Sequence, residues 1–456
     1  MTTVSAPGAP VGAEGARRGT MPVLLTATFM TTLDVFIVNV ALPALRDDLG
    51  AGTAALEWVV AGFGLALASG LITGGRLGDL FGRRRVLGIG LALFTAASVL
   101  CGLASSPGVL IAGRIAQGLA AALLTPQVLA VLRTAYSGTA QAKAFGGYGL
   151  AMGLGAVFGQ LIGGLLIEAD LFGLGWRACF LINLPVGAGA LLLLARVPES
   201  RGPARGFDPV GAGLAALGLA LLVLPLIEGR AHGWPWWTWA CLAAACAVLA
   251  VFVRQERRAA DPVVPLGLFG ERAFSAGLAA TLVLWLGQSS FFLILAMELQ
   301  LGHGLSALEA GTLFTAVGGG YVLVAMKAHV LAERLGRQVI ALGAVLMAVG
   351  LAGMWAAAGH GLVWLLPGMV VDGIGMGMAL APLTGTVLAR IAPAHAGAAG
   401  GVLATVNQVG NALGVAVISI LFFGAADVTA GFRDGVAALV VVELALAGVI
   451  QLLPRR

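Results

Sequence analysis

Long apolar stretches alternate with short polar turns along almost the whole chain. A helix that crosses a membrane needs about 20 apolar residues. On this measure the sequence contains fourteen such stretches: 22–44, 57–77, 86–105, 109–132, 145–168, 178–195, 208–228, 236–254, 274–298, 310–330, 338–358, 361–389, 398–424 and 435–453. The stretch 361–389 is the least regular, because it is long and contains Pro367 and Pro382. The pattern predicts an all-α integral membrane protein.

Composition supports this prediction and excludes a soluble fold. Only 10% of the residues are charged, 59% are hydrophobic and the mean hydropathy is +0.99, whereas soluble domains carry about 25% charged residues. The long apolar runs favour helices over a β-barrel, and the 69 glycines suit close packing between membrane helices. The isoelectric point near 9.4 does not indicate nucleic-acid binding, because the basic residues are scattered over short loops. The expected surroundings are the lipid bilayer.

The basic residues also predict the orientation of the chain. If the N-terminus lies inside, Arg46, Arg177, Arg230 and Arg433 fall on outer loops, and Arg114 and Lys327 fall within spans. The remaining twenty of the 26 Lys and Arg lie on the inner side, as the positive-inside rule requires. We therefore expect both termini in the cytoplasm. Residues 1–21 are expected to form a disordered cytoplasmic tail, since the first apolar stretch is too long for a signal peptide.

A short basic hinge occurs twice, at Gly75–Arg85 and at Leu331–Arg337, each time between two predicted spans. Counting helices around the hinges gives six in 22–195 and six in 273–456. Residues 196–272 hold two extra helices between polar linkers. This six-plus-two-plus-six plan predicts two parallel bundles around a central site, a known transporter design.

These features resemble the fourteen-helix drug:proton antiporter branch of the major facilitator superfamily, over essentially the whole chain. The first hinge resembles the family's motif A, which implies a conformational hinge that stabilises the outward-facing state. In it, the Asp79 carboxylate can accept from arginines or cap a helix N-terminus. A plain topogenic basic loop is the alternative. The hinge residues are Gly75, Gly78, Asp79, Gly82, Arg83 and Arg84, with Glu333 and Arg337 in the second copy.

Two charged residues are the candidates for proton coupling. Asp34 lies in mid-span within Leu33–Pro43, which resembles the helix 1 signature of this branch. A carboxyl in lipid must face the bundle interior or water, and burial favours its protonated form. Arg114 lies in a segment that resembles motif B, which implies a role in proton transfer by tuning a nearby acid. The alternatives are a structural hydrogen-bonding acid and a structural anchor.

The stretch Gly149–Gly164 resembles motif C, the antiporter signature. It implies a smooth helix face for tight packing and sliding, made by Gly155, Gly159, Gly163 and Gly164, with Gln160 where the family usually has proline. Generic small-residue packing explains the glycines equally well, and Gln160 predicts a weaker kink.

Further polar residues within spans are candidates for a substrate cavity: Asn39, Gln117, Glu298, Asp372, Asn407, Gln408 and Asn411. Glu298 and Asp372 are suited to a cationic substrate or to a second proton, although Glu298 is also placed to reach the outer headgroups. For the three residues 407, 408 and 411, hydrogen bonding between helices is the alternative.

The sequence therefore predicts a secondary transporter of the cell (inner or plasma) membrane, acting as a monomer and driven by the proton gradient without a cofactor. Proton-coupled export of lipophilic, cationic or antibiotic molecules is the leading hypothesis. Import of a small solute by proton symport is the alternative on the same fold. A membrane enzyme or sensor is disfavoured, because no nucleophile–base set, nucleotide loop or metal-ligand spacing is found among the five His and four Cys.

Overall fold

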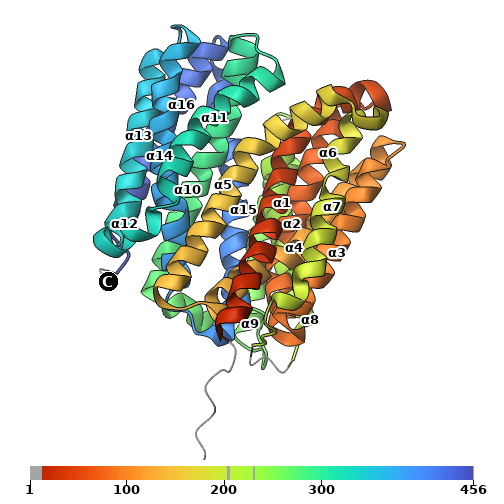
Figure 1. Cartoon of the computed structure of the whole chain (residues 1–456), viewed down its shortest axis with the longest axis vertical. Coiled ribbons are helices and arrows are strands. Elements are labelled where there is room, and N and C mark those ends of the chain that lie inside the picture. The colour runs from red at the N-terminus through yellow and green to blue at the C-terminus, as the bar shows by residue number, and fades with distance from the viewer. Residues whose placement is uncertain (1–12, 203–205, 230–231, 455–456) are drawn as a thin grey trace, which may run out of the picture.

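The computed structural model describes residues 13–202, 206–229 and 232–454, which are almost entirely helical (Figure 1). The N-terminal helices are α1 (Ala13–Leu49), α2 (Thr53–Phe81), α3 (Arg83–Gly102), α4 (Pro107–Ala135), α5 (Gly138–Ala169), α6 (Ala178–Leu181) and α7 (Asn183–Leu193). Two helices follow between the halves, α8 (Pro209–Glu228) and α9 (Trp236–Glu256). The C-terminal helices are α10 (Arg272–Met297), α11 (Ala307–Ala325), α12 (Ala328–Leu335), α13 (Gln338–Ala357), α14 (Leu365–Leu388), α15 (Ala396–Gly424) and α16 (Val428–Ile450).

Thirteen stretches of the described chain are helical, long enough and apolar enough to cross a membrane. They match the predicted spans, with α6 and α7 together forming one of them, Gly175–Arg196. The remaining prediction, 435–453, corresponds to α16. This helix has spanning length and carries three charged residues, Arg433, Asp434 and Glu443.

Two predicted boundaries were wrong. Helix α1 begins at Ala13, so the last part of the tail predicted to be disordered is helical, while residues 1–12 lie outside the described chain. Ala, Glu and Arg in this stretch are good helix formers, and they extend the helix beyond its apolar part. The span predicted for 310–330 ends at Ala325, and the short helix α12 follows it.

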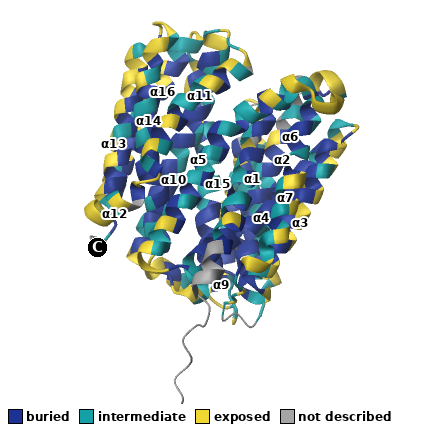
Figure 2. Cartoon of the chain, in the orientation of Figure 1, coloured by how far each residue is buried: buried dark blue, intermediate teal, exposed yellow. Residues whose placement is uncertain are grey.

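The two sets of helices form two bundles side by side (Figure 1). In the N-terminal half, α4 packs on α2 and α3, and α1 packs on α5; in the C-terminal half, α14 packs on α13 and α11, and α10 packs on α15. Contacts between the halves run mainly through α2 with α15 and α5 with α11. Buried residues fill the bundles, and exposed ones lie at the helix ends and outer faces (Figure 2). The chain thus places its polar membrane residues inside a protein rather than in lipid.

Helices α8 and α9 lie against the N-terminal half at its periphery. Helix α8 packs on α2, and α9 packs mainly on α8. Trp236 and Trp239, at the start of α9, are 81% and 60% exposed, as residues of an interfacial aromatic belt would be. The preceding turn includes Arg230, which lies outside the described residues.

Candidate functional site

Asp34 lies at the centre of a buried polar network in the N-terminal half. Its carboxylate accepts hydrogen bonds from Arg114 Nη1 on α4, from Gln117 Nε2 on α4 (3.0 Å) and from Asn183 Nδ2 on α7 (2.8 Å). Ser98 on α3 accepts from the same two amides, at 2.8 Å from Gln117 and 3.2 Å from Asn183. Four helices therefore meet at one carboxyl group.

The network balances charge as well as hydrogen bonds. Asp34 and Arg114 are 0% and 1% exposed, and such a buried ion pair needs further hydrogen bonds to offset its desolvation. Arg114 also donates from Nε to the Val59 carbonyl at 2.9 Å, and its guanidinium lies 4.4 Å from the centre of the Phe63 ring. Adding a proton to Asp34 would remove the negative charge that Arg114 faces, so protonation must disturb the packing of α1 against α4.

The sequence placed Asp34 and Arg114 as a candidate pair, and the structure brings them into contact. It assigns Gln117 to this network and not to a substrate cavity, because the Gln117 side chain is 0% exposed. Ser98 and Asn183 were not predicted as site residues. An Asn within a predicted span, as Asn183 is, is a usable signal, since unpaired amides are costly in a membrane interior.

The first hinge joins the two halves at their predicted cytoplasmic end. Asp79 accepts from Arg83 Nη2 at 2.8 Å and Nε at 3.2 Å, and its second oxygen accepts from the Ala398 backbone N–H at 3.1 Å. Ala398 lies in the first turn of α15, where the helix dipole favours an anion. Arg83 also donates to the Pro393 carbonyl at 2.8 Å. This set of contacts, which we call the cytoplasmic latch, ties α2 and α3 to the C-terminal half.

Glycine is required where the latch turns. Gly82 connects α2 to α3 with φ +104°, a conformation that side chains of L-residues rarely adopt. Gly75 packs directly on the backbone of Gly397, so any side chain there would separate α2 from α15. Arg84 is at the surface, where it lies 3.9 Å from Glu199.

The second hinge, although it resembles the first in sequence, does not make these contacts among the described residues. Glu333 is exposed on α12, and Arg337 donates to the carbonyls of Gln451, at 2.8 Å, and Leu453. Arg337 therefore holds the end of α16 within its own half. The two hinge sequences are alike because they occupy equivalent places in the repeat. The contact of the first hinge with the other half depends instead on which helix end lies opposite that hinge.

Arg133, at the end of α4, adds to the latch. It donates to the carbonyls of Leu388, Ala389 and Ile391 at 2.8 Å each. These carbonyls end α14, and a cation is favoured at a helix C-terminus. Nearer the membrane centre, Tyr321 on α11 donates to the Gly149 carbonyl on α5. The described halves are therefore closed together over their cytoplasmic part.

We expect Asp79→Asn to open the latch, because it removes the charge opposite a buried Arg83. Losing one partner of a buried ion pair costs about 3–5 kcal/mol, and only the closed state has this pair facing α15. Spin labels at Lys143 and Arg390, both exposed, would report the distance between the halves. The variant should shift this distance towards longer values. Arg84→Gln, which alters an exposed pair worth under about 1 kcal/mol, should leave it unchanged; an unchanged distance in both variants would contradict the latch.

The motif C glycines serve two different contacts. Gly155, Gly159 and Gly163 face α1, where a Cβ atom would lie about 3 Å from Thr32, Phe36 and Ile37. Gly153 and Gly164 face α11, against Tyr321 and Leu308. Helix α5 is continuous through Gln160. One helix thus packs closely on its own bundle and, by another face, on the opposite half.

Aromatic rings join the halves near the middle of the membrane. Phe36 on α1 lies 5.8 Å from Phe292 on α10, and Phe292 lies 5.6 Å from Phe314 on α11 (centroid distances). Asn39, one turn beyond Phe36, is exposed. Apolar and aromatic surfaces of this kind are typical of sites for lipophilic ligands.

The other cavity candidates lie in the C-terminal half. Asn411 on α15 accepts from Ser289 on α10 and donates to Gln408 at 3.2 Å, and Asn407 is half-buried. Glu298 does not reach the headgroups: it is 1% exposed and accepts from Thr429 on α16 at 3.2 Å. Asp372 is 1% exposed within the bundle.

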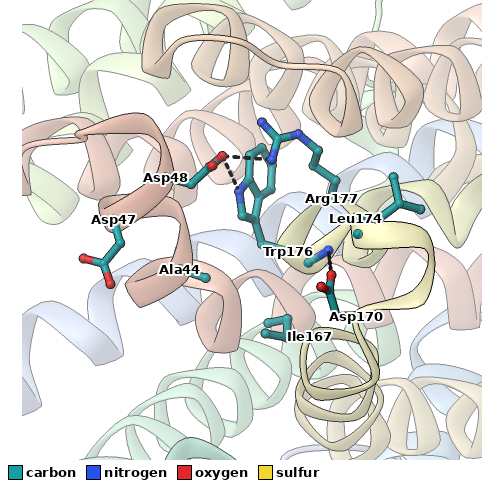
Figure 3. Close-up of a pocket in the computed structure, with 10 residues that line it drawn as sticks. Ala44, Asp47, Asp48, Ile167, Asp170, Leu174, Trp176 and Arg177 are labelled. Atoms are coloured by element: carbon teal, nitrogen blue, oxygen red, sulfur yellow. Dashed lines mark hydrogen bonds and ion pairs between the residues drawn. The ribbon is translucent and has the colours of Figure 1, made fainter.

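A shallow pocket of about 430 Å³ marks the outer end of the N-terminal half (Figure 3). In it, Asp48 accepts from the Trp176 indole at 3.0 Å and pairs with Arg177 at 2.8 Å. The hydrogen bond from Trp176, followed by that from Arg177, lowers the pKa of Asp48 below its usual 3.8. Asp48 therefore stays ionised at neutral pH and ties α1 to the segment before α6, which makes it unsuitable for carrying protons.

Known proteins place this architecture in a family. A family model described as Major Facilitator Superfamily matches residues 24–253, 209–415 and 277–450. The chain belongs to the Major Facilitator Superfamily. This family membership confirms the predicted resemblance and the fold, and it makes the chain a multi-pass membrane transporter and not an enzyme. The same model matches both halves, as a duplicated bundle requires.

Curated members of the superfamily resemble this chain over most of its length. A probable actinorhodin transporter of Streptomyces coelicolor is 43% identical, over 95% of this chain and 77% of its own. A cephamycin export protein of Amycolatopsis lactamdurans is 37% identical (94% and 91%), and a puromycin resistance protein of Streptomyces alboniger is 34% identical (91% and 83%).

Solved structures of superfamily members share the fold at low identity. The human organic anion transporter MFSD10 superposes with a TM-score of 0.69 at 15% identity, covering 97% of this chain and all of that one. The proton:xylose symporter XylE also gives 0.69, at 17% identity, over 95% and 94%. These likenesses concern the fold alone.

Proposed function

We propose that this transporter is a proton-coupled antiporter, acting as a monomer, that exports lipophilic small molecules, with antibiotics as the substrate class. The observation that carries the proposal is the Asp34–Arg114 pair, a buried acid whose hydrogen-bond partners come from other helices. The relatives named for export of actinorhodin and cephamycin and for resistance to puromycin support the direction and the substrate class.

Proton binding at Asp34 is the coupling step in this proposal. A protonated Asp34 no longer balances the charge of Arg114, whose other polar partners, Gln117 and the Val59 carbonyl, are neutral. The buried charge favours a rearrangement that brings it another partner or water. Because Asp34 is fully buried here, proton exchange requires another conformation. Proton binding and movement of the helices are therefore linked.

The movement that we propose is a rocking of residues 22–195 against 273–456, with 196–272 attached to the first bundle. The cytoplasmic latch closes one side, and opening it exposes the interface between the halves to the cytoplasm. The glycine faces of α5 permit sliding without side-chain clashes. Phe36, Phe292 and Phe314 are the proposed contacts for a lipophilic substrate.

The proton gradient supplies enough free energy for a useful gradient of substrate. One proton crossing about 100 mV releases about 2.3 kcal/mol, which sustains roughly a fifty-fold gradient of a neutral molecule. A pH difference adds to this. One proton per molecule is thus sufficient for resistance-level export.

Import by proton symport is the second candidate, because XylE carries out symport on the same fold. The motif C glycines of α5 and the named functions of the relatives favour export. The direction of substrate movement under an imposed gradient separates the two.

A panel of puromycin, lincomycin, cephamycin C and ethidium would test the proposal in cells. We expect cells that contain the protein to accumulate at least one of these compounds about tenfold less than cells without it, since about 1.4 kcal/mol corresponds to tenfold. An uncoupler should abolish the difference. Raised accumulation in cells with the protein would instead support import.

A further inference from the structure

The C-terminal half contains a second buried polar cluster, which the Asp34 mechanism does not use. Asp372 on α14 and Glu443 on α16 are each 1% exposed, and Gln288 on α10 is 2% exposed. The Glu443 carboxyl packs against Gly287 and interacts with Gln288 through a hydrogen bond, and Asp372 is the neighbouring charge that acts on it. Gln288 donates to the Met347 sulfur on α13 at 3.0 Å. Residues of four helices therefore enclose two acids.

This cluster has more acceptors than donors. Both carboxylate oxygens of Asp372, Oε2 of Glu443 and Oε1 of Gln288 are buried without a hydrogen-bond partner among the described residues. The carbonyl oxygen of Gln288 is an acceptor that an acidic O–H would satisfy. Buried acceptors without donors are costly, and a proton on either acid turns one oxygen into a donor. The cluster is thus completed by a proton.

Basic residues of the same bundle are committed elsewhere. Arg433 on α16 donates to the Ala358 carbonyl at 2.5 Å, towards the outer end. Arg337 binds carbonyls at the inner end, as described above. Tyr321 on α11, which packs on α14, donates to the opposite half. Among the described residues, α13 contributes Met347, and Asp372 is the charged neighbour that acts on Glu443.

The position of the cluster repeats that of the Asp34 network. In the N-terminal half the network uses the first, third, fourth and sixth helices of the bundle, through Asp34, Ser98, Arg114 and Asn183. In the C-terminal half the cluster uses the same four helices, through Gln288, Met347, Asp372 and Glu443. Each half contributes six spans, so the helices can be compared in chain order. The first site is balanced by an arginine, whereas the second has two acids and no base among the described residues.

We propose that Asp372 and Glu443 form a second proton-binding site, which holds at least one proton at neutral pH in this conformation. Two buried carboxylates that lack hydrogen-bond donors are far less stable than the same acids with a proton bound. A proton needs no coordination shell, whereas a sodium ion needs several oxygen ligands, and here Met347 and the Gly287 backbone occupy two sides. The role of this second site in transport rests on the proposed function. Exchange of a second proton per molecule would raise the substrate gradient that the transporter can sustain from about fifty-fold to roughly 2,500-fold at about 100 mV.

Infrared spectroscopy of the full chain in lipid bilayers tests the site without any substrate. Protonated carboxyl groups have a C=O stretching band that carboxylates lack, and its intensity is followed as pH is raised. We expect the wild type to keep such a band at pH 7, and the band to be weaker in Asp372→Asn/Glu443→Gln, in which other buried acids such as Glu298 are unchanged. Asp34→Asn should retain it, because Asp34 is the ionised partner of Arg114. Failure of proton-driven export would leave this result unaffected.

Thermal unfolding over the same pH range provides a second readout. In the unfolded chain these acids have ordinary pKa values of about 4. If they hold protons only in the folded state, wild-type stability falls as pH rises above that pKa. The folding equilibrium constant then falls by up to about tenfold per pH unit for each proton held. The double variant should lack this contribution to the dependence of stability on pH. A band that is as intense in the double variant as in the wild type, or a wild-type band that disappears when NaCl replaces choline chloride at fixed pH, would overturn the proposal. So would a double variant that cannot fold at pH 7, since neutral amides then replace acids that we hold to be neutral.

Discussion

Asp34→Asn is expected to abolish proton-driven export while leaving a folded protein in the membrane. Asparagine resembles the protonated acid in shape and charge, so the variant mimics a state that the transporter must visit in each cycle. Gln117 and Asn183 still have an acceptor in the carbonyl oxygen of the substituted side chain, and Arg114 keeps the Val59 carbonyl and the Phe63 ring. What the variant loses is the ability to release a proton.

Accumulation of a transported compound in cells should therefore rise to the level of cells without the protein, a change of at least about tenfold. Asp47→Asn, which changes an exposed carboxyl on the same helix, is the matched control and should transport normally. Normal export by Asp34→Asn would remove this residue from the mechanism.

Arg114→Met is expected to stop transport and to make stability depend strongly on pH. Methionine fills much of the arginine's volume but leaves Asp34 without its counter-charge. Breaking a buried ion pair in this way costs about 3–5 kcal/mol, unless the remaining acid takes up a proton. An ordinary unfolded aspartate titrates near about 3.9, and holding a proton at higher pH costs about 1.4 kcal/mol per unit. The loss of stability should therefore be small near pH 4 and close to its full size at pH 7.

The double variant Asp34→Asn/Arg114→Met separates the charge from the packing. It has no buried charge at this site, so we expect it to regain most of the stability at pH 7 that Arg114→Met loses. Denaturant titrations of both variants at several pH values measure this difference. If Arg114→Met were equally unstable at every pH, the buried charge pair would not be the source of the effect.

The membrane fold was predictable because its signals are local. About twenty apolar residues in a row, an excess of arginine on one side and a basic Gly-containing hinge can each be read from neighbouring residues. The partial failures have local causes too. Helix propensity carried α1 back to Ala13, and α16 begins at Val428, so that it includes the charged Arg433 and Asp434 before the predicted span.

The candidate site was less predictable because its contacts depend on how helices are rotated against one another. Asp34 and Arg114 were identified because charged residues are rare within spans. Ser98 gave no such signal, since serine is common in membrane helices. The contact of Asp79 with α15 depends on which helix of the other half lies opposite it, and no pattern within either half contains this information.

The pairing of Asp372 with Glu443 shows the same limit. Asp372 was identified as costly to bury, but Glu443 lies within the last predicted span and was not considered. The sequence separation of the two residues carries no indication that both are buried in one bundle, with Gln288 beside Glu443. Their relation becomes visible only when the helices of the two halves are matched in order.

Proton movement in everted membrane vesicles is the direct test of proton antiport through Asp34. The vesicle lumen is acidified by the respiratory chain, and a lumenal pH dye is followed when a compound that the cell panel has identified is added outside. The account predicts that the compound enters the lumen and that protons leave it, raising the lumenal pH in wild-type vesicles and not in Asp34→Asn vesicles. Uptake of the compound without any change in lumenal pH, or the same change in both kinds of vesicle, would contradict proton antiport through Asp34.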